Sequence, residues 1–153
     1  MSALSRDCAA AMLETIPAVM RIIREEMRSH RLAGMTVPQL RVLGFLDRCG
    51  PVTLSGVAGH VGVTPPTMSR MVQSLVEAGF VLRGGGSPDR RTVCLEISAR
   101  GRRVLRTARR ATVGHLAKKI ELMRANEVGC IREAMSLLRV LAPDQRQRGS
   151  SKK

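Results

Sequence analysis

A tight turn between two short apolar-striped segments limits what this chain can fold into more than any other feature. Thr53 can cap a short helix, which ends at Gly62-Val63. Thr64 is a good N-cap, and Pro65 fits the first helical position, where its missing N–H costs nothing. Apolar residues then recur at i, i+3, i+4, i+7 and i+8: Met68, Met71, Val72, Leu75 and Val76. This spacing predicts a helix-turn-helix, whose second helix can enter the major groove of DNA.

The segment after this motif has the pattern of a β-hairpin. Phe80–Arg83 predicts a short strand, and residues 92–97 alternate as a second strand with Cys94 on its outward phase. Between them lies the glycine-rich, arginine-tipped sequence Gly84-Gly85-Gly86-Ser87-Pro88-Asp89-Arg90-Arg91. We expect a flexible loop at the tip of a wing.

Helices are expected on both sides of this centre. Thr36-Val37-Pro38-Gln39 has the form of a capping box, which predicts a helix to about Arg48. Ser98 can cap a helix to about Met123, and Asn126 one to about Leu141. Residues 4–31 carry one long apolar stripe, interrupted by Pro17, where the helix is either kinked or begins afresh.

Composition supports a helical, polyanion-binding protein. With two Phe and no Trp or Tyr, the core must consist of aliphatic residues, which favours packed helices. The net charge of +14 is concentrated in residues 102–153, which hold 14 of the 26 Lys and Arg residues. A domain this basic usually meets nucleic acid or an anionic membrane. No apolar run reaches the length of a membrane span and no signal peptide is evident, so we expect a cytoplasmic protein.

The chain resembles the MarR family of winged helix-turn-helix regulators over residues 36–101. The similar stretches are Thr36–Leu43, Thr53–Ala58, Val63–Val72 and Leu75–Val81. The most specific likeness is Asp89-Arg90-Arg91 followed by Leu95-Glu96-Ile97-Ser98-Ala99-Arg100-Gly101, which resembles the family's wing and the helix start after it; Ile97 and Ser98 depart mildly from that pattern. The resemblance implies a homodimer built from terminal helices, with a recognition helix in each major groove and a wing arginine in the minor groove.

We therefore expect a mostly α fold with a small β-hairpin wing and four parts. Residues 1–35 form a dimerisation helix, 36–101 the DNA-binding lobe, 102–142 dimerising C-terminal helices, and 143–153 a disordered tail. The expected dimer residues are Cys8, Met12, Ile16, Val19, Ile23, Ile131, Met135, Leu138 and Leu141.

The expected partner is double-stranded DNA with a palindromic operator, which the protein is expected to repress. Arg70 and Gln73 can donate to purine edges, and a wing arginine can enter a narrow minor groove. Asp89 is expected to pair with a neighbouring arginine. The full set of expected DNA-binding residues is Thr64, Pro66, Thr67, Ser69, Arg70, Gln73, Arg83, Ser87, Asp89, Arg90 and Arg91.

Three alternatives to a simple regulator remain open. A non-specific architectural nucleic-acid-binding protein would use the same charge. A thiol-based redox sensor would use Cys8, but the related peroxide-sensing regulators hold their thiolate with tyrosines, which this chain lacks; a buried interface cysteine is the favoured interpretation. Cys49 and Cys130 lie on apolar stripes and are interpreted as core residues. An enzyme is disfavoured because no catalytic constellation is found.

No cofactor or metal is expected. His30, His60 and His115 are isolated, and His60 is expected to touch phosphate or solvent. Regulators of this kind often release DNA when a small aromatic acid binds, and an effector of unknown identity is possible here. With few aromatics, the candidate contacts for it are Met20, Met27, Met35, Phe45 and Arg24.

Overall fold

The computed structural model describes residues 2–29, 34–84 and 93–141. It contains six helices and three short strands in these ranges, as the mostly α fold class predicted. The order is α1 (Ala3–Ser29), α2 (Val37–Cys49), β1 (Val52–Thr53), α3 (Leu54–Val61), α4 (Pro65–Glu77), β2 (Val81–Gly84), β3 (Cys94–Ile97), α5 (Ala99–Ile120) and α6 (Ala125–Leu141). No helix in the described ranges is long and apolar enough to cross a membrane.

The predicted helix starts in the centre of the chain agree with the structure. At α2 the Thr36 hydroxyl accepts from the backbone of Gln39, whose side chain accepts from the Thr36 backbone N–H at 2.8 Å. Thr53 caps α3, which ends at Gly62 in the left-handed conformation (φ 74°, ψ 38°) that glycine adopts without strain. These caps set the lengths of the first two helices of the lobe and the turn that precedes α4.

The sheet has one strand more than the predicted hairpin. Its order is β1-β3-β2, and all pairs are antiparallel: Val52 lies opposite Leu95 on one side, and Val81 lies opposite Ile97 on the other. The predicted outward position of Cys94 is wrong, because β3 is the central strand and Cys94 is only 8% exposed between its two neighbours.

The core runs from Met35 to Ala108 and so includes the first part of α5. It is aliphatic except for Phe45 and Phe80, and Leu43, Leu46, Met68, Leu75 and Val72 are among its fully buried side chains. Ser98 is the one buried polar residue of the described ranges; its hydroxyl donates to the carbonyl of Gly79 and accepts from the backbone of Gly101. The bond to Gly79 joins the start of α5 to the residue that follows α4, whereas the bond from Gly101 caps α5 itself. Because the Ser98 backbone N–H also donates to the carbonyl of Phe80, the start of α5 is fixed to the end of α4.

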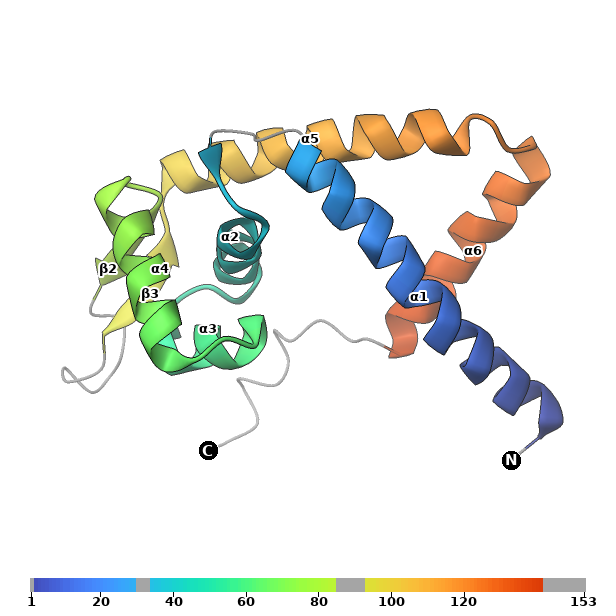
Figure 1. Cartoon of the computed structure of the whole chain (residues 1–153), viewed down its shortest axis with the longest axis horizontal. Helices are drawn as coiled ribbons and strands as arrows, with labels where there is room; N and C mark the ends of the chain where they lie inside the picture. Colours follow the sequence, from blue (N-terminus) through green and yellow to red (C-terminus); the bar gives the residue numbers. More distant parts are fainter. Residues whose placement is uncertain (1, 30–33, 85–92, 142–153) are drawn as a thin grey trace.

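The terminal helices extend away from this lobe (Figure 1). Helix α1 is one unbroken helix through Pro17, so a second helix beginning there is ruled out. Helix α6 begins at Ala125, not after Asn126, because the Glu127 carboxylate accepts from the backbone N–H and the side chain of Arg124 and caps this end. These bonds also lower the pKa of Glu127. Helix α5 connects the lobe to this outer part, with Lys119 paired to Glu26 of α1 at 3.0 Å.

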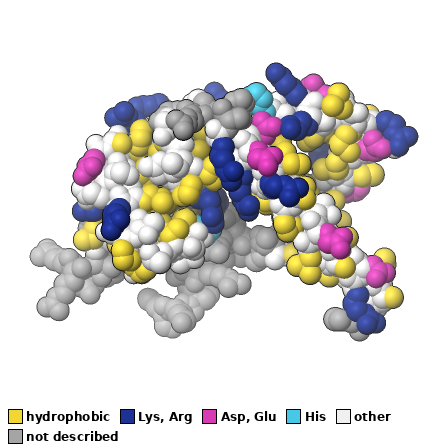
Figure 2. All heavy atoms as spheres, in the orientation of Figure 1, with side chains coloured by type: hydrophobic (Ala, Val, Ile, Leu, Met, Phe, Trp, Pro, Cys, Tyr) yellow, Lys and Arg dark blue, Asp and Glu magenta, His cyan; other side chains and the backbone are white. Residues whose placement is uncertain are grey.

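Much of the apolar surface of α1 and α6 has no cover in the single chain. Ile16, Val19, Met135 and Leu141 are 42%, 47%, 50% and 70% exposed, and Figure 2 shows hydrophobic side chains along this outer part. Cys8 is exposed, and Cys130, interpreted from sequence as a core residue, is exposed as well. That interpretation is wrong for the single chain, since α6 has no buried residue.

Candidate nucleic-acid interface

Helix α4 separates its residues into a buried and an exposed face. Met68, Val72 and Leu75 are buried against the lobe, while every predicted contact on the helix (Pro66, Thr67, Ser69, Arg70 and Gln73) is exposed. The helix therefore presents these side chains, polar except for Pro66, as one outward surface. An exposed α-helix with a polar face of this width fits the major groove of B-DNA.

The start of α4 carries two hydroxyl groups beside two prolines. Thr64 has the extended backbone of an N-cap, but its hydroxyl bonds to the hydroxyl of Thr67 at 2.9 Å and makes no capping bond to the helix. Pro65 and Pro66 have no N–H to donate. The two hydroxyls thus lie together at the positive end of the helix dipole, where a backbone phosphate is favoured.

The base of the wing meets the far end of the same face. Arg83 of β2 donates from Nη2 to Oε1 of Gln73 at 2.7 Å, and Gln73 donates from Nε2 to Oε1 of Glu77 at 2.7 Å. Gln73 and Arg83 were both predicted as DNA contacts. The bond between them, and the bond from Gln73 to Glu77, were not predicted. The i,i+4 spacing of Gln73 and Glu77 was the available signal. The predicted wing contacts Ser87, Asp89, Arg90 and Arg91 lie outside the described residues.

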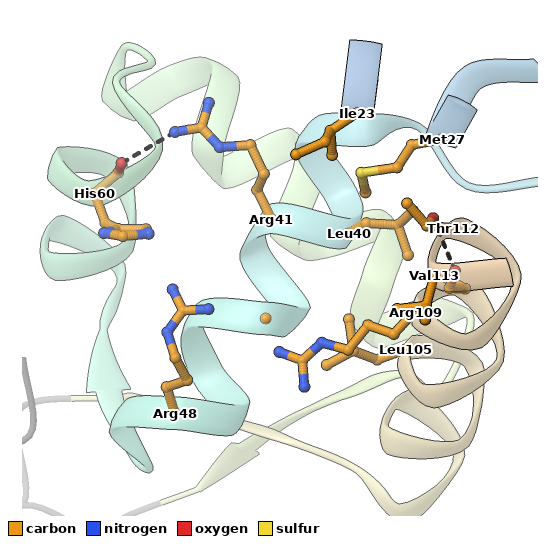
Figure 3. Close-up of a pocket in the computed structure, with 12 residues that line it drawn as sticks. Ile23, Met27, Leu40, Arg41, Arg48, His60, Leu105, Arg109, Thr112 and Val113 are labelled. Atoms are coloured by element: carbon orange, nitrogen blue, oxygen red, sulfur yellow. Dashed lines mark hydrogen bonds between the residues drawn. The ribbon is translucent and has the colours of Figure 1, made fainter. Parts of the chain in front are cut away.

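A second feature lies on the inner side of the lobe, between α1, α2 and α5. An open cleft of about 390 Å³ has an apolar floor that includes Ile23, Met27, Leu40 and Leu105. The side chains of Arg48 and Arg109 point toward each other across this cleft (Figure 3). Arg41 also lines the cleft, but its guanidinium points toward the carbonyl of His60. A Cβ placed on Gly44 would lie 3.6 Å from Nη1 of Arg48 and 3.9 Å from Nη2 of Arg109, so both guanidinium groups lie close to the backbone of α2 at this position.

His60 connects this cleft to the helix-turn-helix. Its ring stacks on Phe45 with 4.0 Å between centroids, and its carbonyl accepts from Arg41 at 3.5 Å. His60 was predicted to touch phosphate or solvent. It is instead half-buried, with its ring packed on Phe45. Partial burial, followed by the charges of Arg48 and Arg41, lowers its pKa.

The predicted effector contacts are divided by the structure. Met27 lines the cleft, whereas Met35 and Phe45 are buried in the core. Met20 and Arg24 are exposed on α1 and do not line the cleft. Sequence reasoning missed the arginines, because their convergence depends on how α2 packs against α5. No group of three or more potential metal ligands occurs within the described ranges.

The helix order, the exposed face of α4 and the three-stranded sheet define a winged helix-turn-helix protein. Residues 33–92 match the family model described as MarR family. The HTH-type transcriptional regulator Mb0904 of Mycobacterium bovis is 31% identical over 127 residues, which are 83% of this chain and 89% of that protein. The chain belongs to the MarR family, whose members are transcription regulators and not enzymes.

Two further relatives are informative. The HTH-type transcriptional repressor Rv2887 of Mycobacterium tuberculosis is 30% identical over 74% of this chain and 70% of its own length. Its crystal structure in complex with salicylic acid superposes with a TM-score of 0.64 at 23% identity, over 81% of this chain and 93% of that one. The structure of RV1404 from the same organism has a TM-score of 0.73 at 24% identity, over 94% and 97% of the two chains.

Proposed function

We propose that this protein is a homodimeric repressor that binds a palindromic operator through α4. The single observation that supports this most strongly is the division of α4, where a buried apolar stripe leaves the polar side chains of the helix exposed to solvent. Arg70, in the middle of that face, is the residue for purine recognition, since a bidentate arginine is the commonest specific contact to guanine. Thr64, Thr67 and Ser69 are proposed to donate hydrogen bonds to the flanking phosphates.

The wing supplies the minor-groove contact in this proposal. The resemblance to the family assigns an arginine of Asp89-Arg90-Arg91 to that groove, with Asp89 holding its neighbour in position. Ser87 is proposed as a phosphate contact of the same loop. The exposed Arg103, Arg106 and Arg110 of α5 add long-range attraction without reading sequence.

Dimerisation through the terminal helices is proposed from their uncovered apolar surface. Ile16, Val19, Ile131, Met135 and Leu141 are at least 38% exposed, and Cys8 of the same stripe is exposed too. Leu141 of α6 approaches α1 around Met12 and Ile16, so both helices form one apolar surface. Met12 and Leu138 of these helices are partly buried, whereas Ile23 lies in the floor of the cleft between α1, α2 and α5. Covering such a surface with a second copy removes it from water, and a two-fold dimer would read a palindrome.

Repression is proposed because the relative Rv2887 is named a repressor. The test is selection of bound fragments from the host genome, followed by footprinting. A regulator enriches one inverted repeat and protects only that sequence. Uniform protection of all DNA would instead identify a non-specific architectural protein, the competing function that uses the same positive charge.

Control by a small anionic ligand is a second proposed function, carried by the cleft of Figure 3. Its apolar floor and bordering arginines suit an amphipathic acid, and Rv2887 has been crystallised with salicylic acid. Calorimetric titration with salicylate as the probe tests this. We expect binding that Arg109→Ala weakens and that Arg110→Ala, an exposed neighbour outside the cleft lining, does not. Equal binding by both variants would contradict the cleft as the site.

A further inference from the structure

The hydrogen-bonded chain at the junction of α4 and the wing assigns a role to Gln73 that differs from base reading. Glu77, Gln73 and Arg83 are all exposed, yet their side chains are joined by two bonds of 2.7 Å. Each bond has one ionised partner, and charge-assisted bonds are shorter and roughly twice as strong as neutral ones. The junction is therefore ordered before DNA arrives.

The two charged neighbours define one orientation of the Gln73 amide. A guanidinium can only donate, so it selects the amide oxygen, and an ionised carboxylate can only accept, so it selects the amide nitrogen. A glutamine that recognises adenine needs the same oxygen and nitrogen for the N6 and N7 edge of the base. Gln73 could read a base in that way only after losing both of its charge-assisted bonds.

Arg83, in contrast, uses one of its N–H groups among the residues that the structure describes. A guanidinium has five N–H groups, and the bond to Gln73 uses Nη2 of Arg83. Its strand β2 leads from the end of α4 into the wing and is paired to β3 at Leu95. The guanidinium thus lies between the two elements that contact DNA in the proposed function, where a backbone phosphate passes from the major toward the minor groove.

We propose that Gln73 is a positioning residue, which holds the Arg83 guanidinium for a backbone phosphate, and that Glu77 fixes the orientation of Gln73. Arg83 is the residue that touches DNA. Sequence preference then comes from Arg70 and the wing, and Gln73 contributes equally to every sequence. This inference rests on the proposed DNA-binding function.

The test is a double-mutant cycle measured by fluorescence anisotropy with the selected operator and with a random duplex. We expect Gln73→Ala to weaken binding to both duplexes by the same factor, about tenfold or less. In an Arg83→Ala background the same change should have almost no effect. Arg83→Ala itself should reduce the salt slope by about one unit, because one phosphate contact is lost.

A pair of variants at Glu77 provides the matched control. Glu77→Gln and Glu77→Ala both remove the negative charge beside DNA, but only glutamine retains an oxygen that can accept from Gln73. We expect Glu77→Gln to bind more tightly than Glu77→Ala, and the difference between them to vanish in the Gln73→Ala background.

Two results would overturn the inference. One is a Gln73→Ala variant that loses discrimination at a single base pair while its affinity for random DNA is unchanged. The other is an effect of Gln73→Ala that persists undiminished in the Arg83→Ala background. These results would leave the proposed function intact, whereas wild-type protein that binds no duplex would contradict that function and this inference with it.

Discussion

His60 of α3 stacks face to face on Phe45 of α2, with 11° between the ring planes. The contact joins the first helix of the helix-turn-helix to the helix that borders the cationic cleft. Since Arg48 and Arg41 also act on the imidazole, protonation of His60 adds a third positive charge to a partly buried site. The stacked pair is therefore sensitive to pH as well as to packing.

We expect this pair to lower the stability of the protein in mild acid. The pKa of His60 is lower in the folded chain than its ordinary value of 6.5, so the unfolded state binds more protons between the two values. The free energy of unfolding then decreases as the pH falls below about 6.5. Urea unfolding of wild type and His60→Gln between about pH 7.5 and about pH 5.5 measures this. Identical pH dependence of the two proteins would contradict it.

A glycine contact at the start of α5 gives a prediction about stability. A Cβ on Gly101 would lie 2.9 Å from Cγ1 of Ile97 and closer still to the carbonyl oxygen of Phe80. We expect Gly101→Ala to cost about 1–3 kcal/mol through overpacking. Gly114→Ala is the matched control in the same helix, since nothing lies within 4 Å of its Cβ, and it should be neutral or stabilising by up to about 1 kcal/mol. Thermal unfolding that ranks the two variants in the opposite order would refute this packing argument.

Arg70 and Arg106 should differ in how they contribute to DNA binding. Arg70→Ala removes a proposed base contact and should reduce the ratio of operator to random affinity by about 1–3 kcal/mol. Arg106→Ala should weaken binding to all DNA alike and reduce the salt slope by about one unit at most. A competition assay between operator and random duplex separates the two effects. If both variants kept the same ratio, the division between reading and attraction would be wrong.

The wing arginine provides a separate prediction. Arg91→Ala should weaken operator binding by at least about tenfold, which corresponds to about 1.4 kcal/mol, because a minor-groove contact is lost. Gel-shift titration near physiological salt measures this change. Unchanged affinity would remove Arg91 from the proposed interface.

Local sequence signals predicted those parts of the fold that local physics determines. The Thr36–Gln39 capping box and the Gly62 helix end depend on residues within one turn of each other, and both agree with the structure. Strand β1 has only two residues, Val52 and Thr53, and exists because β3 pairs with it across some forty residues of sequence. No periodicity could reveal it, and the burial of Cys94 was missed for the same reason.

The candidate site shows the same division. The exposed face of α4 follows from its 3.6-residue period, so its polar residues could be identified from the sequence. The bond between Gln73 and Arg83 depends on how β2 returns along α4, and the cleft depends on how α5 packs on α2. Asp47 of α2 forms ion pairs with Arg102 and Arg109 of α5 and so contributes to this packing. Nothing in the sequence around Asp47 indicated these ion pairs.

The measurement that tests the central claim most directly is sedimentation equilibrium of the free protein at micromolar concentration. The uncovered apolar residues of α1 and α6 predict a single species of twice the 16.7 kDa chain mass. Ile16→Glu combined with Leu138→Glu should give monomers that bind the operator weakly, since each half-site alone lacks the joint contacts. A wild-type species of single-chain mass that still binds its operator tightly would contradict the dimeric regulator proposed for this protein.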